Sequence, residues 1–375
     1  MSQTEKLLRE LIALPSVNPA FLPPNDPRAG EQRMVDFLAA IAAKAGLDID
    51  FQTVLPGRSN FLARLAPREK ARHRIVLAPH LDTVNADDDL FIPREKNGRI
   101  YGRGACDTKG CVAAMMTALC ELACQASRPA QTEILFAGLV DEENGQAGSR
   151  ALAGSRLRAD LAIVGEPTRL QAVTAHKGDL WMIIRTRGLS AHGALPELGR
   201  NAVHAMARVV DLLETKYARL LKRRTHSVLG HPTINVGSIR GGTQANIVPD
   251  SCEILVDRRT IPGETELGVE REIHSFLRKY RLEVTFDKGR LAPCEPMETS
   301  PKLPLVAQFF RIIGQRKPAG VNYFCDASVL SRGGIPSIVF GPGDIAYAHR
   351  PDEWIGLDSL DRGKDMLLKF LKSLP

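Results

Sequence analysis

Residues 75–82, IVLAPHLD, form an almost unbroken apolar run that ends in a histidine and an aspartate. Apolar runs of this length are typical of a strand that is buried on both faces of a parallel sheet. Similar runs occur at 132–140, TEILFAGLV, and at 161–165, LAIVG, and a helical apolar stretch at 109–126 separates the first two. Strands that alternate with helices predict an α/β domain with a mostly parallel sheet.

The pattern changes after about Lys177. Several of the following runs alternate apolar and polar residues, as the strands of a half-exposed antiparallel sheet do. The predicted strands are 180–187, 233–239, 252–259 and 282–287, and the predicted helices are 201–221 and 264–280. This segment is therefore expected to be a separate, smaller α+β domain.

The α/β rhythm returns from about residue 290, with a predicted helix at 302–314 and the strand SIVF at 337–340. A chain of 375 residues also exceeds what one compact core usually holds. We therefore predict a larger catalytic domain, made of residues 1–177 and 289–375, into which the smaller domain of residues 178–288 is inserted.

The composition, with 44% hydrophobic and 25% charged residues, is that of a globular chain. It contains no apolar run of about eighteen residues, so we expect no membrane partner. The formal charge of +7 is spread along the chain without a recognition motif, so we expect no nucleic-acid partner either. The N-terminal residues resemble an amphipathic helix rather than a signal peptide.

Seven cysteines, an odd number without a repeating spacing, favour free thiols and a cytoplasmic location. Cys120 and Cys124 lie four residues apart on a helical pattern. No further thiol or imidazole lies close to them in the sequence, so we expect small buried side chains there rather than a metal site.

Polar residues with ligand chemistry interrupt the apolar runs where the predicted strands end. In an open α/β sheet the ligand crevice lies at the carboxyl ends of the strands, so these side chains should meet at one edge. A single strand-end histidine or aspartate is usually a capping residue; the combination is what indicates a site. The residues are His80, Asp82, Asp107, Asp141, Glu142, Glu143, Glu166 and His349.

So many carboxylates in one place repel each other and lose hydration, and a bound divalent cation, or a pair of them, would offset that cost. Imidazole and carboxylate ligands together suit zinc, although cobalt or manganese could replace it. Asp82 follows His80 by two residues, so both side chains point to the same side and Asp82 can orient a ligating imidazole. The adjacent Glu142 and Glu143 point in different directions, so one can bind metal while the other holds a water.

The segments PHLDTV, YGRGACDTKG, VDEENG, GEPT and AHRPDEW resemble the signature blocks of one family of dinuclear zinc exopeptidases and deacylases. The family includes acetylornithine deacetylase, succinyl-diaminopimelate desuccinylase, aminoacylase and glutamate carboxypeptidase. The blocks occur in the family's order and cover nearly the whole chain. The resemblance implies a catalytic α/β domain with an inserted lid and dimerisation domain, and two metal ions.

The resemblance also implies roles for individual residues. His80 and Glu166 bind one metal, Glu143 and His349 bind the other, and Asp107 bridges both. Asp82 orients His80, and Glu142 is the general base. The peptide bond between Asp107 and Thr108 is expected to be cis, although cis bonds before residues other than proline are rare.

Three residues of the smaller domain match the family as well. LSAHGALPELGRNA resembles the block whose histidine, here His192, steadies the developing oxyanion, in many members across a homodimer. GGTQANIVPD places Asn246 at a substrate-contacting position, and VDRR places Arg259 where a substrate carboxylate is held. Arg259 should share a strand face with Asp257, while Arg258 points away.

These features predict an enzyme in which a metal-activated water hydrolyses the amide bond of an N-acyl amino acid. A di- or tripeptidase, or a glutamate-type carboxypeptidase, with the same metal centre is the alternative. A non-catalytic ligand-binding relative and a nucleic-acid-binding protein are competing readings from other classes. The first would lack part of the metal set, and the second would show salt-sensitive DNA binding.

Overall fold

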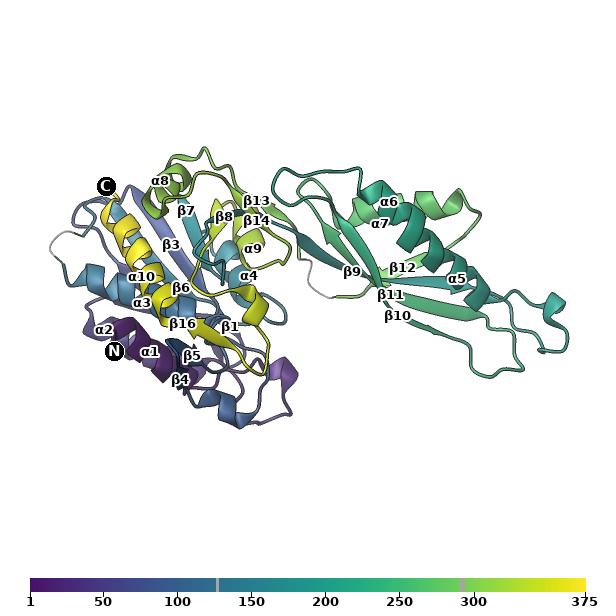
Figure 1. The fold of residues 1–375 in the computed structure, drawn as a ribbon, viewed down its shortest axis with the longest axis horizontal. Helices are drawn as coiled ribbons and strands as arrows, with labels where there is room; N and C mark the ends of the chain where they lie inside the picture. Colours follow the sequence, from purple (N-terminus) through teal and green to yellow (C-terminus); the bar gives the residue numbers. More distant parts are fainter. Residues whose placement is uncertain (126–127, 291–293) are drawn as a thin grey trace. The chain divides into compact units, whose positions relative to one another are not determined.

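The computed structural model describes residues 1–125, 128–290 and 294–375. These residues form two compact units (Figure 1). The larger unit comprises residues 1–174, 299–319 and 325–375, and the smaller unit comprises residues 175–298 and 320–324. The larger unit holds most of a mixed sheet that is flanked by helices, and the smaller unit holds an antiparallel sheet with helices, so the predicted fold class is confirmed.

The main sheet has the strand order β1-β2-β6-β3-β7-β15-β8-β13 in the part of the chain that the structure describes, and β14 pairs with β8. Its four central strands, β6, β3, β7 and β15, are parallel, whereas the pairs on both sides of them are antiparallel. The strands are β1 (Asp48–Leu55), β2 (Arg58–Leu65), β3 (His73–Pro79), β6 (Thr132–Gly138), β7 (Leu161–Gly165), β8 (Val173–His176), β13 (Met297–Glu298), β14 (Ala319–Val321) and β15 (Ser337–Val339).

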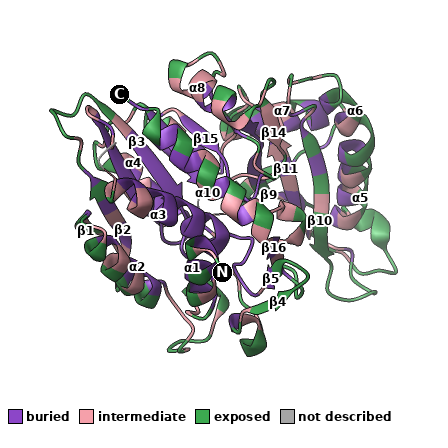
Figure 2. Ribbon diagram, turned by 60° about the vertical axis from the view of Figure 1, so that its left-hand side comes forward, coloured by how far each residue is buried: buried purple, intermediate pink, exposed green. Residues whose placement is uncertain are grey.

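Helices cover both faces of this sheet. α3 connects β3 to β6, and α4 connects β6 back to β7 on the other side of β3, so right-handed crossovers place the two helices on opposite faces. α3 is buried along nearly its whole length because α1 and α10 pack outside it (Figure 2). The helices are α1 (Gln3–Ile12), α2 (Gln32–Lys44), α3 (Lys109–Ala123), α4 (Ala147–Gly154), α8 (Pro304–Ile313), α9 (Ala327–Arg332) and α10 (Leu357–Lys372).

Local sequence signals explain where several of these helices begin and end. The Ser2 side chain caps α1 by accepting the backbone N–H of Glu5 at 3.1 Å. Pro304 opens α8, and Gly314, with a φ of 74°, ends it in the left-handed conformation that glycine adopts readily. Among the described residues, no helix is both long and apolar enough to cross a bilayer.

Three short strands form a further sheet with the order β16-β5-β4. These strands were not predicted, because three residues are too few to show an alternating pattern. Their bounds are β4 (Arg94–Lys96), β5 (Arg99–Tyr101) and β16 (Trp354–Gly356).

The smaller unit is an antiparallel sheet of order β10-β11-β9-β12 packed against helices. Along β11 every second side chain is buried, as a sheet covered on one face requires. β12 begins at Thr285 rather than at residue 282, and the helix predicted at 201–221 contains one π-helical turn. The elements are β9 (Gly178–Arg187), β10 (Thr233–Gly241), β11 (Ser251–Thr260), β12 (Thr285–Lys288), α5 (Ala202–Leu212), the π turn Leu213–Tyr217, α6 (Ala218–Leu221) and α7 (Glu266–Arg278).

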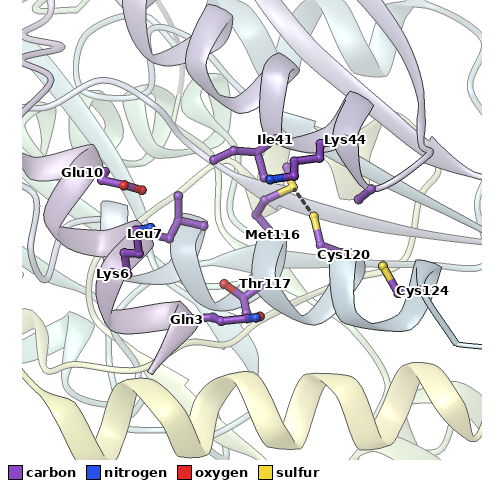
Figure 3. A pocket seen from close by; sticks show the side chains of 11 residues that line it. Gln3, Lys6, Leu7, Glu10, Ile41, Lys44, Met116, Thr117, Cys120 and Cys124 are labelled. Carbon is purple, nitrogen blue, oxygen red and sulfur yellow. Dashed lines mark hydrogen bonds between the residues drawn. The ribbon is translucent and has the colours of Figure 1, made fainter. Parts of the chain in front are cut away.

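The larger unit has an open pocket of about 400 Å³ between α1, α2 and the C-terminal half of α3 (Figure 3). Cys120 and Cys124 line it together with Met116, whose sulfur lies 3.6 Å from the Cys120 thiol. Cys120 is only partly buried and Cys124 is exposed, so the expectation that both are buried was wrong. Cys124 directly follows Ala123, the last residue of α3.

Candidate metal centre

Three parallel strands deliver acidic and imidazole side chains to one edge of the main sheet. His80 directly follows β3, and Glu166 directly follows β7. Glu142 and Glu143 lie in the turn after β6. Because β6, β3 and β7 are neighbours with the same direction, their carboxyl ends lie together, as the sequence predicted.

The carboxylate of Asp107 lies between two histidines. Its Oδ1 is 3.1 Å from Nε2 of His80, and its Oδ2 is 3.2 Å from Nε2 of His349. The peptide bond between Asp107 and Thr108 is cis, as predicted. A carboxylate whose two oxygens each lie close to a different imidazole can serve as a ligand that bridges two metal ions.

The remaining two predicted ligands complete the same cluster. Glu143 lies 3.2 Å from Nε2 of His349, and Glu166 lies 3.9 Å from Nε2 of His80. One ligand atom each from His80, Asp107 and Glu143 lie within 4.8 Å of one another. The structure therefore brings together all five residues predicted to bind metal.

The electrostatics of the cluster fit a bound cation. Burial raises the pKa of Glu142 and of Glu166 well above the ordinary value of a glutamate. Burial acts in the same direction on Asp107, but hydrogen bonds from the imidazoles, first from His349, lower its pKa overall. Hydrogen bonds to the carboxylates of Asp107 and, with a smaller effect, Glu143 raise the pKa of His349 to about 10. Positive charge on the imidazoles thus balances this buried acidic cluster. A divalent cation such as zinc, bound by the neutral imidazoles and the carboxylates, would supply that positive charge in their place.

Asp82 joins the end of β3 to the turn after β6. Its Oδ1 lies 3.4 Å from Nδ1 of His80 and accepts the backbone N–H of Glu142 at 3.0 Å. Its Oδ2 accepts the backbone N–H of Glu143 at 3.1 Å. The backbone carbonyl of Asp82 is closer still to Nδ1 of His80, at 3.0 Å. The Nδ1 side of the ring is thereby held, and Nε2 faces the carboxylates.

A polar network behind Asp82 was not identified from the sequence. Asn18 donates to Asp82 at 2.7 Å and to Asp141 at 3.0 Å, and Arg58 also donates to Asp141 at 3.0 Å. Asp141 has a φ of 69°, so the turn that carries Glu142 begins in the left-handed conformation. Asn18 lies in a proline-rich stretch, and Asp82 and Asp141 lie 64 and 123 residues away in the sequence, so no local pattern indicates the network.

Two buried carboxylates near the cluster were also missed. Asp326 accepts hydrogen bonds from Ser149 and Gln146, and burial raises its pKa to about 6. Glu353 accepts backbone N–H groups from the loop that carries Asp107. Glu353 lies only four residues after His349 in AHRPDEW, so its position in that block was the available signal.

The smaller unit holds the three other predicted residues. His192 and Asn246 are exposed on neighbouring loops, where the N–H of Gly193 donates to the Asn246 carbonyl at 2.7 Å. Arg259 is partly exposed and binds both oxygens of Asp257, at 2.9 and 3.0 Å. Arg258 is buried on the opposite strand face and pairs with Glu264. The predicted alternation of the two arginines is thus confirmed.

Comparisons with known proteins agree with this geometry. The model of the peptidase family M20/M25/M40 matches residues 76–373. The acetylornithine deacetylases of Proteus mirabilis (strain HI4320) and Edwardsiella ictaluri (strain 93-146) are each 32% identical to the chain. The matches cover 98% and 97% of the chain, respectively, and 96% of each relative.

Solved structures show the same fold. The aminopeptidase PepT of Bacillus cereus ATCC 10987 superposes with a TM-score of 0.79 at 21% identity, over 99% of this chain and 97% of that one. A dinuclear metal-binding peptidase of the M20 family from Bacillus subtilis superposes with a TM-score of 0.71 at 13% identity, over 98% of this chain and 96% of that one. With the family match across most of its length and a buried His/Asp/Glu cluster at the sheet edge, the chain belongs to peptidase family M20/M25/M40 and is a metallohydrolase that acts on carbon–nitrogen bonds.

Proposed function

We propose that the chain is a dinuclear zinc amidohydrolase that removes the acyl group from an N-acyl amino acid, in the manner of an acetylornithine deacetylase. The observation that carries this proposal is the position of the Asp107 carboxylate, which has one oxygen next to His80 and the other next to His349. The names of the relatives at 32% identity favour the deacylase over a peptidase. Cobalt or manganese can take the place of zinc with the same ligands.

In this proposal His80 and Glu166 would hold one ion, Glu143 and His349 would hold the other, and Asp107 would be a ligand of both. When bound, such ions polarise an amide carbonyl and lower the pKa of a water molecule toward neutrality. Asp82 keeps Nε2 of His80 directed at the centre by holding the opposite side of the ring.

Glu142 is the proposed general base. Burial raises its pKa well above the ordinary value, and the carboxylate of Glu166 adds to this effect while His80 opposes it. A carboxylate with a raised pKa can take a proton from the attacking water and return it to the leaving amine. The backbone of Glu142 is held by Asp82, which fixes the position of the base.

The smaller unit is proposed to supply substrate contacts and to act as lid and dimerisation domain. Nδ1 of His192 accepts the N–H of Ala194 at 3.1 Å, so the ring proton of the neutral form lies on Nε2, ready to donate to an oxyanion. Asn246 is assigned a substrate contact. The guanidinium of Arg259 is assigned to the substrate carboxylate, which it can bind bidentately.

A second copy of the chain is the proposed partner. β10 is an edge strand of the small sheet, and several large apolar side chains on it and on nearby loops are exposed. Edge strands of this kind are ready to pair with another chain. Sedimentation should show a dimer, and a fully active monomer would refute a role of His192 across the interface. The exposed residues are Leu189, Leu195, Leu198, Ile239 and Ile247.

A metal-supplemented hydrolysis screen tests the proposed activity. The substrates are N-acetylornithine, N-succinyl-diaminopimelate, other N-acyl amino acids and short peptides, each with and without a chelator. We expect chelator-sensitive release of an acyl group. Faster hydrolysis of peptides would replace the deacylase with the peptidase alternative, and activity that survives complete metal removal would refute both.

A further inference from the structure

We propose that Glu353 is a positioning residue of the metal centre, because it fixes the loop of Asp107 and ties it to the loop of His349. This inference rests on the proposed function, since the centre that Glu353 serves is the metal site assigned above. Glu353 itself faces backbone groups and one arginine rather than the cluster.

Both oxygens of Glu353 are fully used by one short loop. Its Oε1 accepts the backbone N–H of Cys106 at 2.8 Å and that of Asp107 at 2.9 Å. Its Oε2 accepts the backbone N–H of Gly104 at 3.0 Å and a guanidinium N–H of Arg103 at 2.7 Å. Four donors within five consecutive residues therefore converge on a single carboxylate.

The burial of this carboxylate is hard to explain by stability alone. Glu353 is 0% exposed and Arg103 is 4% exposed, so both charges have lost their hydration. Replacing a buried ion pair with well-packed apolar residues is often neutral or even stabilising. An apolar side chain, however, would leave the N–H groups of Gly104, Cys106 and Asp107 without this acceptor. The arrangement instead specifies one conformation of the loop.

The Asp107 loop is bound by two other segments of the chain, and each of these segments also carries a proposed metal ligand. Glu353 follows His349 by four residues, so it connects the loops of two ligands whose side chains lie 3.2 Å apart. On the other side, the hydroxyl of Thr108 donates to the carbonyl of Gly165, the residue before Glu166. Ligand geometry tolerates displacements of only about 0.5 Å, so a loosened Asp107 loop would disturb the site.

The test is the substitution Glu353→Gln. The amide group replaces one acceptor oxygen with a donor, so in either orientation an N–H group of the loop faces another donor. We expect the dissociation constant for Co²⁺, measured by equilibrium dialysis, to rise about 10- to 100-fold, as for other residues that orient metal ligands. The visible absorption spectrum of the Co²⁺-loaded protein should also change.

Glu133→Gln is the matched control. Glu133 is also a buried carboxylate that pairs with arginines, but it lies near the amino end of β6, at the opposite edge of the sheet. This variant should lose stability without any change in Co²⁺ affinity or spectrum. Glu353→Asp provides a second test, because it keeps the charge but withdraws the carboxylate from the loop.

The outcomes separate this inference from the proposed function. A folded Glu353→Gln protein with wild-type Co²⁺ affinity and spectrum would overturn the role of Glu353 while leaving the metal centre intact. A wild-type protein that binds no Co²⁺ would instead defeat the proposed function. If neither Glu353→Gln nor Glu353→Asp folded even with saturating Co²⁺, Glu353 would be needed for the fold itself, and the inference would also be overturned.

Discussion

The carboxylate of Asp82 accepts the backbone N–H of Glu142 at 3.0 Å, and thereby connects the strand end that carries His80 to the turn that carries the proposed base. The same carboxylate accepts the N–H of Glu143 at 3.1 Å. One side chain thus orients an imidazole and positions two consecutive glutamates. Asp82 is for this reason expected to affect both metal binding and turnover.

Asp82→Asn should weaken metal binding or activity by about 10- to 100-fold, the usual effect of removing a group that orients a metal ligand. The carboxylate of Asp82 accepts the side-chain amide of Asn18 and the backbone N–H groups of Glu142 and Glu143. The side-chain amide of an asparagine would place a donor against one of these donors. Metal titration and steady-state kinetics measure the effect. Asp48→Asn, at an exposed position of β1, is the control; equal behaviour of the two variants would contradict the assigned role.

Glu142→Gln should retain the metal ions and lose about 100- to 10,000-fold in kcat, the usual contribution of a general base. The amide is isosteric with the carboxylate but cannot take the proton from water. Metal analysis of the purified variant, together with kcat measured on the best substrate of the screen, decides the point. Activity within a few-fold of the wild type would eliminate Glu142 as the base.

Arg259→Lys should raise KM about 10- to 100-fold and change kcat much less. A lysine keeps the charge but loses the two-pronged contact, and a hydrogen bond to a charged group contributes about 1.5–3 kcal/mol. Arg187→Lys, at the exposed end of β9, serves as the control. If Arg259→Lys left KM unchanged, the substrate carboxylate would have to bind elsewhere.

His176, at the end of β8, predicts a pH dependence of stability that is separate from catalysis. Its ring is fully buried, and burial lowers its pKa from 6.5 to about 4. Between these values the unfolded chain takes up a proton that the folded chain does not, so stability falls as the pH drops below 6.5. The loss from this one group is at most about 1.4 kcal/mol for each pH unit.

Urea unfolding of the metal-free protein at pH 7 and pH 5 measures this dependence. His176→Gln removes the titrating group, so its midpoint should fall less between the two pH values than that of the wild type. The carboxylates titrate alike in both proteins, and the comparison therefore isolates His176. Equal falls in the two proteins would show that His176 titrates normally in the folded state.

Much of the centre could be predicted because strand ends are a local feature of the sequence. The apolar runs before His80 and Glu166 end at the ligands themselves, and parallel strands bring such ends together. His349 required the family resemblance, because it lies ten residues beyond the last residue of β15. His349 reaches Asp107 through a loop, and the sequence of a loop shows no helical or strand periodicity from which its course could be predicted.

The supporting groups could not be predicted in the same way. Glu353 contacts the N–H of Asp107 across 246 residues of sequence, and Asn18 contacts Asp82 across 64. Such contacts depend on the packing of the whole unit rather than on any local pattern. The helix α10 was also missed, although Leu360, Leu367 and Leu371 recur on one face at helical spacing.

The most direct test of the central claim is anomalous diffraction from crystals grown with Zn²⁺. The account predicts two ions, one on each side of the Asp107 carboxylate. One should lie about 2.0–2.1 Å from a ring nitrogen of His80, and the other at the same distance from His349. Absence of zinc at this cluster, or zinc bound by other residues, would contradict it.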